Sequence, residues 1–247
     1  MGLSGGDSMG SPQLSVLIAA YNEAATIRGV LDALRELSYE MEIIVVDDGS
    51  RDDTAKIVAQ LAQSDPRITL LSHERNRGKG AAIRTALGHC SGAVAIIQDA
   101  DAEYDPADIP RLVDLILDGT ADVVYGSRLR GGQPQRAHLF WHYAGNRFLS
   151  LITCVLFNTT LSDMEVGYKA IRGDIARGLK LVSDDFRIEP EITARILVIP
   201  QLRIYEVPIS YYGRTFAEGK KITWRDGLWA ALALARFRVT TWWESSR

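Results

Sequence analysis

The first half of this 247-residue chain alternates short apolar segments with amphipathic ones, and this alternation is its strongest constraint on the fold. Five apolar runs have the length and composition of buried strands: 14–19, 42–46, 68–72, 93–98 and 123–125. Four segments between them carry apolar residues at helical spacing: 23–37, 54–63, 80–87 and 109–117. Strands that alternate with helices predict an α/β fold, with a mainly parallel central sheet and helices on both faces.

Polar loops follow four of the predicted strands, at 20–23, 47–50, 99–101 and 126–128. Parallel strands end at the same edge of a sheet, so these loops are expected to lie together. Open α/β sheets bind their ligands beyond the carboxyl ends of the strands. The sequence therefore predicts one ligand site at this edge.

The acidic loop at 99–105 carries the most specific chemistry of the four. Asp99, Asp101 and Glu103 occupy alternate positions, so their carboxylates point to one side if the backbone is extended there. Nothing nearby is expected to neutralise this charge except a metal, and hard oxygen ligands suit Mg²⁺ or Mn²⁺. Because Mg²⁺ usually binds one or two carboxylates together with substrate phosphates, the loop favours a phosphate-bearing substrate. A solvated acidic loop is the alternative.

Composition excludes several classes of protein. With a net charge of -3, the chain lacks the overall positive charge of a nucleic-acid-binding protein, so no nucleic acid partner is expected. The two cysteines, Cys90 and Cys154, form neither a disulfide framework nor a metal-ligand spacing, which suits a reducing compartment. Residues 1–12 are rich in Gly and Ser and lack the apolar core of a signal peptide. We expect a flexible tail there and a cytoplasmic location.

Two later stretches, 148–157 and 228–235, are apolar but far shorter than the ~20 residues that span a bilayer. Arginines and aromatic residues flank both, as in helices that lie in the lipid headgroup region. Burial within the domain or against another subunit is the alternative, so the sequence leaves a homo-oligomer open. The expected organisation is a tail at 1–12, one domain at 13–228 and a C-terminal amphipathic helix at 229–247 that contacts the membrane surface.

Five motifs, taken in order, resemble those of family 2 glycosyltransferases of the GT-A fold. Within that family they are most similar to dolichyl-phosphate and polyprenyl-phosphate mannose or glucose synthases. The motifs are Tyr21-Asn22-Glu23, Val-Val-Asp-Asp-Gly-Ser at 45–50, Asn-Arg-Gly-Lys-Gly at 76–80, Asp99-Ala100-Asp101 and Gly-Ser-Arg at 126–128. Each is weak alone, but their order and spacing identify the fold and the reaction class over residues 14–228.

The resemblance implies that a nucleoside diphosphate sugar binds at the carboxyl edge of the sheet. Glu23 and Asp48 are suited to accept hydrogen bonds from the base or ribose, with helix capping as the other role for Asp48. Asp99 contacts the donor, while Asp101 and Glu103 hold Mg²⁺ or Mn²⁺ against the diphosphate. At Glu103 this chain departs from lipid-phosphate mannose synthases, in which glutamine is frequent at this position. The implied nucleotide-sugar contacts are Ala19, Tyr21, Glu23, Val46, Asp48, Lys79, Asp99, Ala100, Arg128, Arg214, Lys220 and Lys221.

The second half carries the implied acceptor chemistry. Asp163-x-x-x-Gly167-Tyr168-Lys169 matches the family's element beside the reacting sugar, and Phe186-Arg-Ile-Glu-Pro-Glu191 matches the helix start that follows it. Asp163 either orients a sugar hydroxyl or serves as general base for an alcohol acceptor, whereas a phosphate acceptor needs no base. Arg128 suits a diphosphate or acceptor phosphate, with a surface ion pair as its alternative. The implied catalytic residues are Asp99, Asp101, Asp163, Arg128 and Arg214.

The resulting hypothesis is a metal-dependent, inverting transfer of a hexose from GDP-mannose or a UDP-sugar to a polyprenyl or dolichyl phosphate. The reaction is expected at the cytoplasmic face of a membrane, with the enzyme bound peripherally. One alternative keeps the reaction and changes the acceptor to a soluble or cell-envelope sugar. Another is a non-catalytic nucleotide-sugar-binding protein. A nucleotidyltransferase is disfavoured, because residues 20–23 are not the Gly-rich phosphate loop typical of such enzymes.

Overall fold

A seven-stranded sheet forms the centre of the computed structural model, which describes residues 12–134, 136, 140–213 and 224–245. Its strand order is β3-β2-β1-β4-β6-β5-β7. β6 runs antiparallel to β4 and β5, and the other neighbouring strands are parallel. The strands are β1 Leu14–Ala20, β2 Met41–Asp47, β3 Ile68–Ser72, β4 Val94–Asp99, β5 Val123–Ser127, β6 Lys169–Arg172 and β7 Ile204–Pro208.

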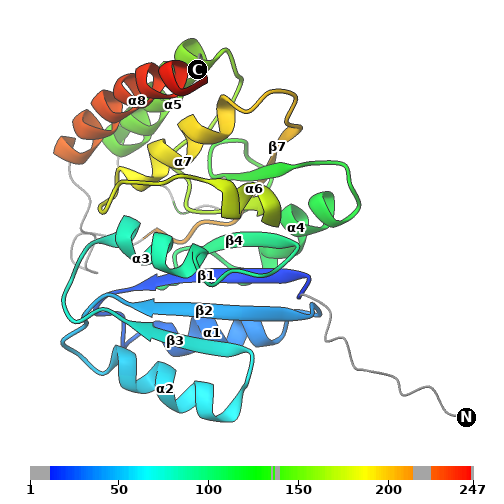
Figure 1. The fold of residues 1–247 in the computed structure, drawn as a ribbon, viewed down its shortest axis with the longest axis vertical. Helices are drawn as coiled ribbons and strands as arrows, with labels where there is room; N and C mark the ends of the chain where they lie inside the picture. The colour runs from blue at the N-terminus through cyan, green and yellow to red at the C-terminus, as the bar shows by residue number, and fades with distance from the viewer. Residues whose placement is uncertain (1–11, 135, 137–139, 214–223, 246–247) are drawn as a thin grey trace, which may run out of the picture.

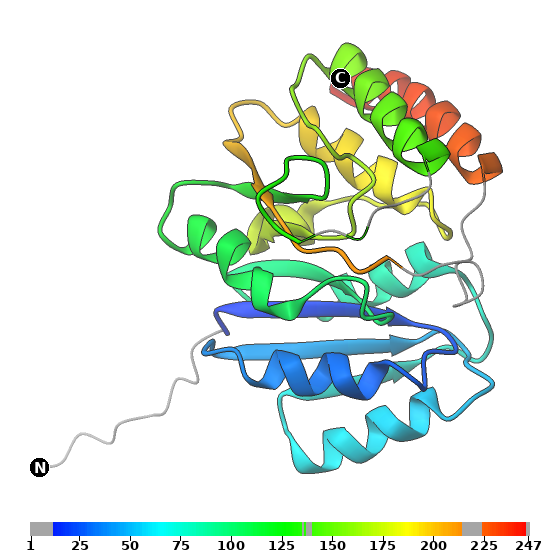
Figure 2. The same cartoon turned by 180° about the vertical axis from the view of Figure 1, so that it is seen from behind.

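Helices cover both faces of this sheet. Figure 1 shows α3 in front of the strands, and Figure 2, seen from behind, shows α1 in front of them. The α/β fold with a mainly parallel sheet is thus confirmed. The helices are α1 Ile27–Arg35, α2 Thr54–Ser64, α3 Lys79–Leu87, α4 Ile109–Leu117, α5 Phe140–Phe157, α6 Gly173–Gly178, α7 Ile188–Leu197 and α8 Trp224–Ser245, with a 3₁₀ turn η1 at Pro106–Asp108.

The central strands read as continuous apolar runs because both of their faces are buried. Leu14, Leu17 and Ile18 of β1 are at most 1% exposed, as are Ile43 and Ile44 of β2. The predicted bounds of β3 and α4 match the structure. The predicted helix at 23–37 begins only at Ile27, because residues 23–26 form a turn in which the Thr26 amide donates to the Glu23 carbonyl.

The four polar loops lie at one edge of the sheet, as predicted. β1, β2 and β4 are parallel neighbours, so their following loops meet directly. β5 also runs in the direction of β4, because both are antiparallel to β6. The loop that ends in Arg128 therefore lies at the same edge as the acidic loop.

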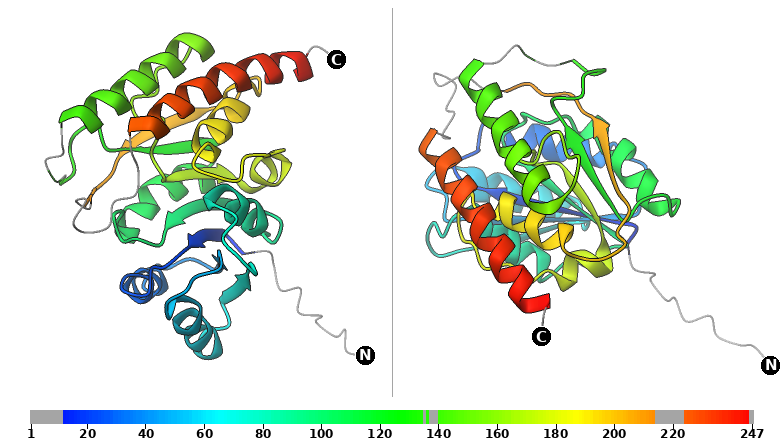
Figure 3. Two further views of the ribbon diagram at one scale, coloured as in Figure 1. Left: turned by 90° about the vertical axis from the view of Figure 1, so that its left-hand side faces the viewer. Right: turned by 90° about the horizontal axis from the view of Figure 1, so that it is seen from above.

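α5 and α8 lie side by side in a layer beyond α7, at the end of the molecule far from β3 (Figures 1 and 3). α8 begins at Trp224, so the predicted start of the C-terminal helix at residue 229 is wrong. No feature of residues 224–229 interrupts helical backbone, and the single helix continues through the expected boundary. None of the helices in the described ranges is long and apolar enough to cross a bilayer.

The start of α3 packs closely on residues 183–185, and we predict opposite effects of alanine at two helical glycines. A Cβ on Gly80 would lie 2.3 Å from the Ser183 carbonyl oxygen, whereas a Cβ on Gly29 of α1 meets nothing within 4 Å. Gly80→Ala should destabilise the protein by about 1–3 kcal/mol through overpacking. Gly29→Ala should stabilise it by up to about 1 kcal/mol through helix propensity. Chemical denaturation measures both, and equal effects of the two variants would contradict the packing argument.

Candidate active site

A partly buried ion pair joins the start of α3 to the end of β4. Nζ of Lys79 lies 2.7 Å from Oδ1 of Asp99 and 2.9 Å from Oε1 of Glu189. Burial lowers the pKa of Lys79, but the two facing carboxylates outweigh it and hold the pKa well above its ordinary value. The ammonium therefore stays charged. The prediction that nothing but a metal neutralises the acidic loop is wrong for Asp99, because the fold brings Lys79 from the start of the preceding helix against its carboxylate.

Glu189 extends this ion pair into the interior. Its Oε2 accepts a hydrogen bond from Nζ of Lys169, a fully buried ammonium that also donates to the Val166 carbonyl. Burial raises the pKa of Glu189, yet Lys169 and Lys79 together hold it below its ordinary value. Four charges thus alternate in sign from Asp99 through Lys79 and Glu189 to Lys169. Glu189 belongs to the family motif at 186–191 but was not a predicted site residue, because an acidic residue in the first turn of a helix is favourable by itself.

Asp48 shapes the loop that carries Lys79. Its Oδ1 accepts a hydrogen bond from the Arg77 amide at 2.9 Å, and its Oδ2 accepts one from the Gly78 amide at 2.8 Å. Nδ1 of His73 lies 2.6 Å from the same Oδ1. Capping of α2 by Asp48 is wrong, because the Thr54 amide donates to Asp52 instead. The nucleotide contact of Asp48 stays a prediction.

Strand register brings several predicted donor contacts together. Ala19 of β1 is paired with Val46 of β2 on one side and with Asp99 of β4 on the other. The Thr26 hydroxyl lies 2.8 Å from the Ala100 carbonyl oxygen and 3.1 Å from Oε2 of Glu23. The loop that contains Tyr21 and Glu23 is therefore held against the acidic loop.

The acidic loop turns where an extended chain was expected. Ala102 has a φ of 58°, and Oδ1 of Asp101 accepts a hydrogen bond from the Glu103 amide at 3.1 Å. The predicted alternation is wrong, because a left-handed residue reverses the direction of the backbone. Oε2 of Glu103 accepts a hydrogen bond from the Tyr211 hydroxyl at 2.6 Å.

No group of three or more His, Cys, Asp or Glu side chains that could hold a metal occurs among the residues with described positions. Asp101 and Glu103 still present hard oxygen donors, and both lie in the same tight turn. Two carboxylates are what a Mg²⁺ or Mn²⁺ site needs when substrate phosphates complete the coordination. The donor set therefore fits a metal that binds together with its substrate.

Arg128 and Asp163 form a buried bidentate pair. Nε and Nη2 of Arg128 each lie 2.8 Å from a different oxygen of Asp163, and the Arg128 amide donates to the same carboxylate at 2.9 Å. Asp163 is fully buried, so the expected surface ion pair of Arg128 is instead an internal one. Burial lowers the pKa of Arg128, but Asp163 outweighs it and raises that pKa. Both oxygens of Asp163 are occupied by Arg128, so the geometry favours a positioning role for Asp163.

Aromatic residues join the acidic loop to the motif around Gly167. The ring of Tyr104 stacks on Tyr168, with centroids 4.8 Å apart, and the Gly167 amide donates to the Tyr104 hydroxyl at 3.0 Å. A Cβ on Gly167 would lie 2.6 Å from Oδ2 of Asp99. Glycine is therefore required for the backbone to approach Asp99 so closely. Neither tyrosine was a predicted site residue, and only the aromatic position of the motif hinted at this stack.

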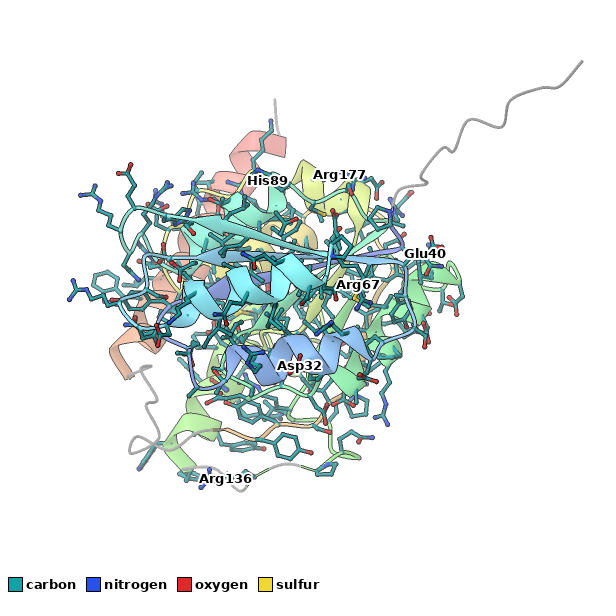
Figure 4. The ribbon with its side chains drawn as sticks, turned by 90° about the horizontal axis from the view of Figure 1, so that it is seen from below. Asp32, Glu40, Arg67, His89, Arg136 and Arg177 are labelled. Atoms are coloured by element: carbon teal, nitrogen blue, oxygen red, sulfur yellow. The ribbon has the colours of Figure 1, made fainter. Side chains whose placement is uncertain are left out.

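The segment after β7 completes this side of the site. The Arg136 amide donates to the Tyr211 carbonyl, and the Tyr211 amide donates to the Pro134 carbonyl. Figure 4 shows Arg136 at the edge of the molecule, apart from the labelled surface residues Asp32 and Arg67. The guanidinium of Arg128 lies 5.1 Å from the centroid of the Tyr211 ring. The predicted Arg214, Lys220 and Lys221 lie outside the described residues.

Glu165 is a partly buried residue that was not a predicted site residue. Its Oε1 is buried without a hydrogen-bond partner in the described part of the chain. Burial, reinforced by the charge of Glu189, raises the pKa of Glu165 to about 7. Lys169 and Arg128 oppose this shift, and Asp163 adds to it. Such a group can hold or release a proton near neutral pH.

Known proteins resemble this chain over most of its length. The family model described as glycosyl transferase family 2 matches residues 15–160. A UDP-N-acetylglucosamine–dolichyl-phosphate N-acetylglucosaminyltransferase of Methanococcus voltae is 30% identical over 235 residues, which cover 87% of this chain and 92% of the relative. An undecaprenyl-phosphate mannosyltransferase of Micrococcus luteus is 30% identical over 243 residues, which cover 94% and 96%.

Solved structures show the same fold. Glucosyl-3-phosphoglycerate synthase from Mycobacterium tuberculosis, in complex with Mn²⁺, uridine diphosphate and phosphoglyceric acid, superposes with a TM-score of 0.68 at 21% identity. The match covers 92% of this chain and 78% of that one. A mannosyltransferase from Pyrobaculum calidifontis, in complex with GDP-mannose and Mn²⁺, superposes with a TM-score of 0.58 at 23% identity over 82% of this chain and 57% of that one. The predicted GT-A fold is confirmed.

The raised pKa of Glu165 predicts a stability effect that depends on pH. An unfolded chain ionises this residue near 4.5, whereas the native protein does so near 7. Stability should therefore fall as pH rises between these values, because the native state keeps a proton that the unfolded state has lost. Glu165→Gln removes this cost. The Tm of the variant minus that of the native sequence should therefore be at least about 2 °C higher at pH 8 than at pH 5.

Thermal unfolding at the two pH values measures this difference. The matched control is Glu36→Gln, which alters an exposed carboxylate at the end of α1. A Tm difference for Glu165→Gln that does not change with pH, or that matches the control, would contradict the assignment.

Proposed function

The chain belongs to glycosyl transferase family 2 and is a glycosyltransferase, and from this premise we propose that it transfers a hexose from a nucleoside diphosphate sugar to a polyprenyl phosphate. One observation carries the choice of acceptor. Two relatives that match nearly their whole length are named for dolichyl phosphate and undecaprenyl phosphate as acceptors. GDP-mannose and UDP-sugars are the donors to test, because solved proteins of the same fold bind GDP-mannose or uridine diphosphate.

In this proposal the donor lies across the carboxyl ends of β1, β2 and β4. Tyr21, Glu23 and Asp48 bind the nucleoside beside the backbone of Ala19 and Val46, which the strand register places abreast of Asp99. Lys79, Asp99 and Ala100 lie near the diphosphate and sugar. Asp101 and Glu103 hold Mg²⁺ or Mn²⁺, which would neutralise the charge of the departing diphosphate. Arg214, Lys220 and Lys221 are assigned to the same diphosphate from sequence alone.

The acceptor phosphate approaches from the side of Arg128. An ionised phosphate oxygen attacks the anomeric carbon opposite the diphosphate, so the bond to the leaving oxygen breaks as the new bond forms and the configuration inverts. No general base is required, because the phosphate oxygen already carries negative charge. Arg128, fixed by Asp163, keeps a positive charge beside the incoming phosphate.

A hydroxyl acceptor, such as a soluble or cell-envelope sugar, is the second candidate, and Glu165 is the observation that favours it. A carboxyl whose pKa is raised to about 7 is suited to accept a proton from an attacking hydroxyl at neutral pH. Under this alternative Glu165, rather than the bidentate Asp163, serves as the base.

We further propose that α5 and α8 dock on a lipid surface at the cytoplasmic face of a membrane. Figures 1 and 2 show the N-terminal ends of both helices on the side toward which the parallel strands point. Exposed Arg147 and Arg236 on these helices suit anionic lipid headgroups. The large apolar side chains exposed on them are Phe140, Trp141, Tyr143, Phe148, Leu151, Val155, Trp229, Leu232 and Val239.

Transfer of labelled sugar tests the reaction. We expect label from GDP-mannose or a UDP-sugar to enter the organic-extractable fraction when a polyprenyl phosphate and Mn²⁺ or Mg²⁺ are present. Asp101→Asn should lower this rate on the order of 100-fold, because it removes a carboxylate that holds the metal against the diphosphate. Asp118→Asn, at the exposed end of α4, is the matched control. Label that stays in the aqueous phase on a sugar acceptor would favour the second candidate and exclude the lipid phosphate.

Vesicle binding tests the apolar surface. Trp141→Ser, Phe148→Ser and Val155→Ser together should abolish co-sedimentation with vesicles that contain phosphatidylglycerol, because all three side chains are exposed on α5. The control is Val182→Ser with Tyr205→Ser, which removes exposed apolar side chains elsewhere. Vesicle binding by the triple variant would contradict the lipid-docking proposal. A homo-oligomer that only the triple change dissociates would show instead that the surface binds a second copy of the chain.

A further inference from the structure

The carboxylate of Glu189 is shared by two ammonium groups from different parts of the fold. Lys79 approaches it from the start of α3 and Lys169 from β6, while Glu189 itself lies in the first turn of α7. Lys79 contacts Asp99 at the same time, so its ammonium has one carboxylate on each side. Only Asp99 of these four residues belongs to the acidic loop that the proposed donor approaches.

We propose that Glu189 is a positioning residue for donor binding, because it anchors the ammonium of Lys79 beside Asp99. This inference rests on the proposed nucleotide-sugar site. Glu189 does not itself touch the substrate. It keeps Lys79 compensated when Asp99 turns to the donor sugar, so that the ammonium remains in place to meet the negative charge of the diphosphate.

Burial makes this arrangement sensitive to the loss of Glu189. The side chains of Glu189 and Lys169 are 6% and 0% exposed, and that of Lys79 is 16% exposed. Without Glu189, Lys79 has Asp99 as its remaining ion-pair partner in the described structure, and the two close on each other. The donor must then compete with a tighter internal pair for both groups.

Two variants separate positioning from folding. Glu189→Gln alone leaves the fully buried Lys169 uncompensated, which endangers the fold. Glu189→Gln combined with Lys169→Met removes the unpaired charge and still leaves Lys79 without its anchor. The control is Arg187→Met, which breaks the exposed 2.8 Å ion pair with Asp185 at the start of the same helix.

We expect the double variant to unfold near the Tm of the native sequence and to raise the KM for the nucleotide sugar about 10-fold, which corresponds to about 1.4 kcal/mol. The dissociation constant of the nucleoside diphosphate with Mn²⁺, measured by calorimetry without acceptor, should rise by a similar factor. The acceptor KM of the double variant should stay within about 2-fold of the native value, as should the donor KM and the nucleotide dissociation constant of Arg187→Met.

A double-mutant cycle with Lys79→Met distinguishes positioning through Lys79 from a general structural role of Glu189, with the donor KM as the measured quantity. If Glu189 acts through Lys79, then adding Glu189→Gln and Lys169→Met to Lys79→Met should change the donor KM by less than about 2-fold. Equal losses in both backgrounds would overturn the inference, as would a folded double variant with native donor affinity. A native protein that binds no nucleotide sugar would instead overturn the proposed function.

Discussion

The ammonium of Lys79, held between Asp99 and Glu189, is the interaction on which the arrangement of the site depends. It joins the end of β4 to the start of the preceding helix, α3, and to α7, which lies far from both in the sequence. Its geometry depends in turn on Asp48, which binds the Arg77 and Gly78 amides and so fixes the loop just before Lys79. Charges removed from water in this way are stable only when each has a partner. The loss of one charge among Asp99, Lys79, Glu189 and Lys169 is therefore expected to destabilise the others.

Close backbone contacts complete the same site. Gly167 allows the chain to pass within contact distance of Asp99, and Gly80 allows α3 to pack on the segment before α7. The stack of Tyr104 on Tyr168 then holds the acidic loop against the Gly167 motif. The donor side and the acceptor side are therefore parts of one packed unit, with the Arg128–Asp163 pair at its border.

Much of the first half of the fold was predictable, because its signals are local. The bounds of β3 and α4 follow from apolar periodicity within single segments. The later elements were less accessible: β6 is four residues long and antiparallel, and α8 begins before the expected boundary. The candidate site was predicted as a set of loops and a family pattern. Glu165 and Glu189 lie inside motifs of that pattern, but neither they nor Tyr104 carry a local signal for the contacts that they make in the folded chain.

The sequence by itself determined the alternation of strands and helices, the edge at which the polar loops gather and the family to which the chain belongs. These properties reside in the order and spacing of neighbouring residues. Only the tertiary structure decided which charges meet: Asp99 with Lys79, Asp163 with Arg128, and Glu189 with two lysines. Ion-pair partners come from segments far apart along the chain, and their distance and burial exist only once the sheet and helices have packed.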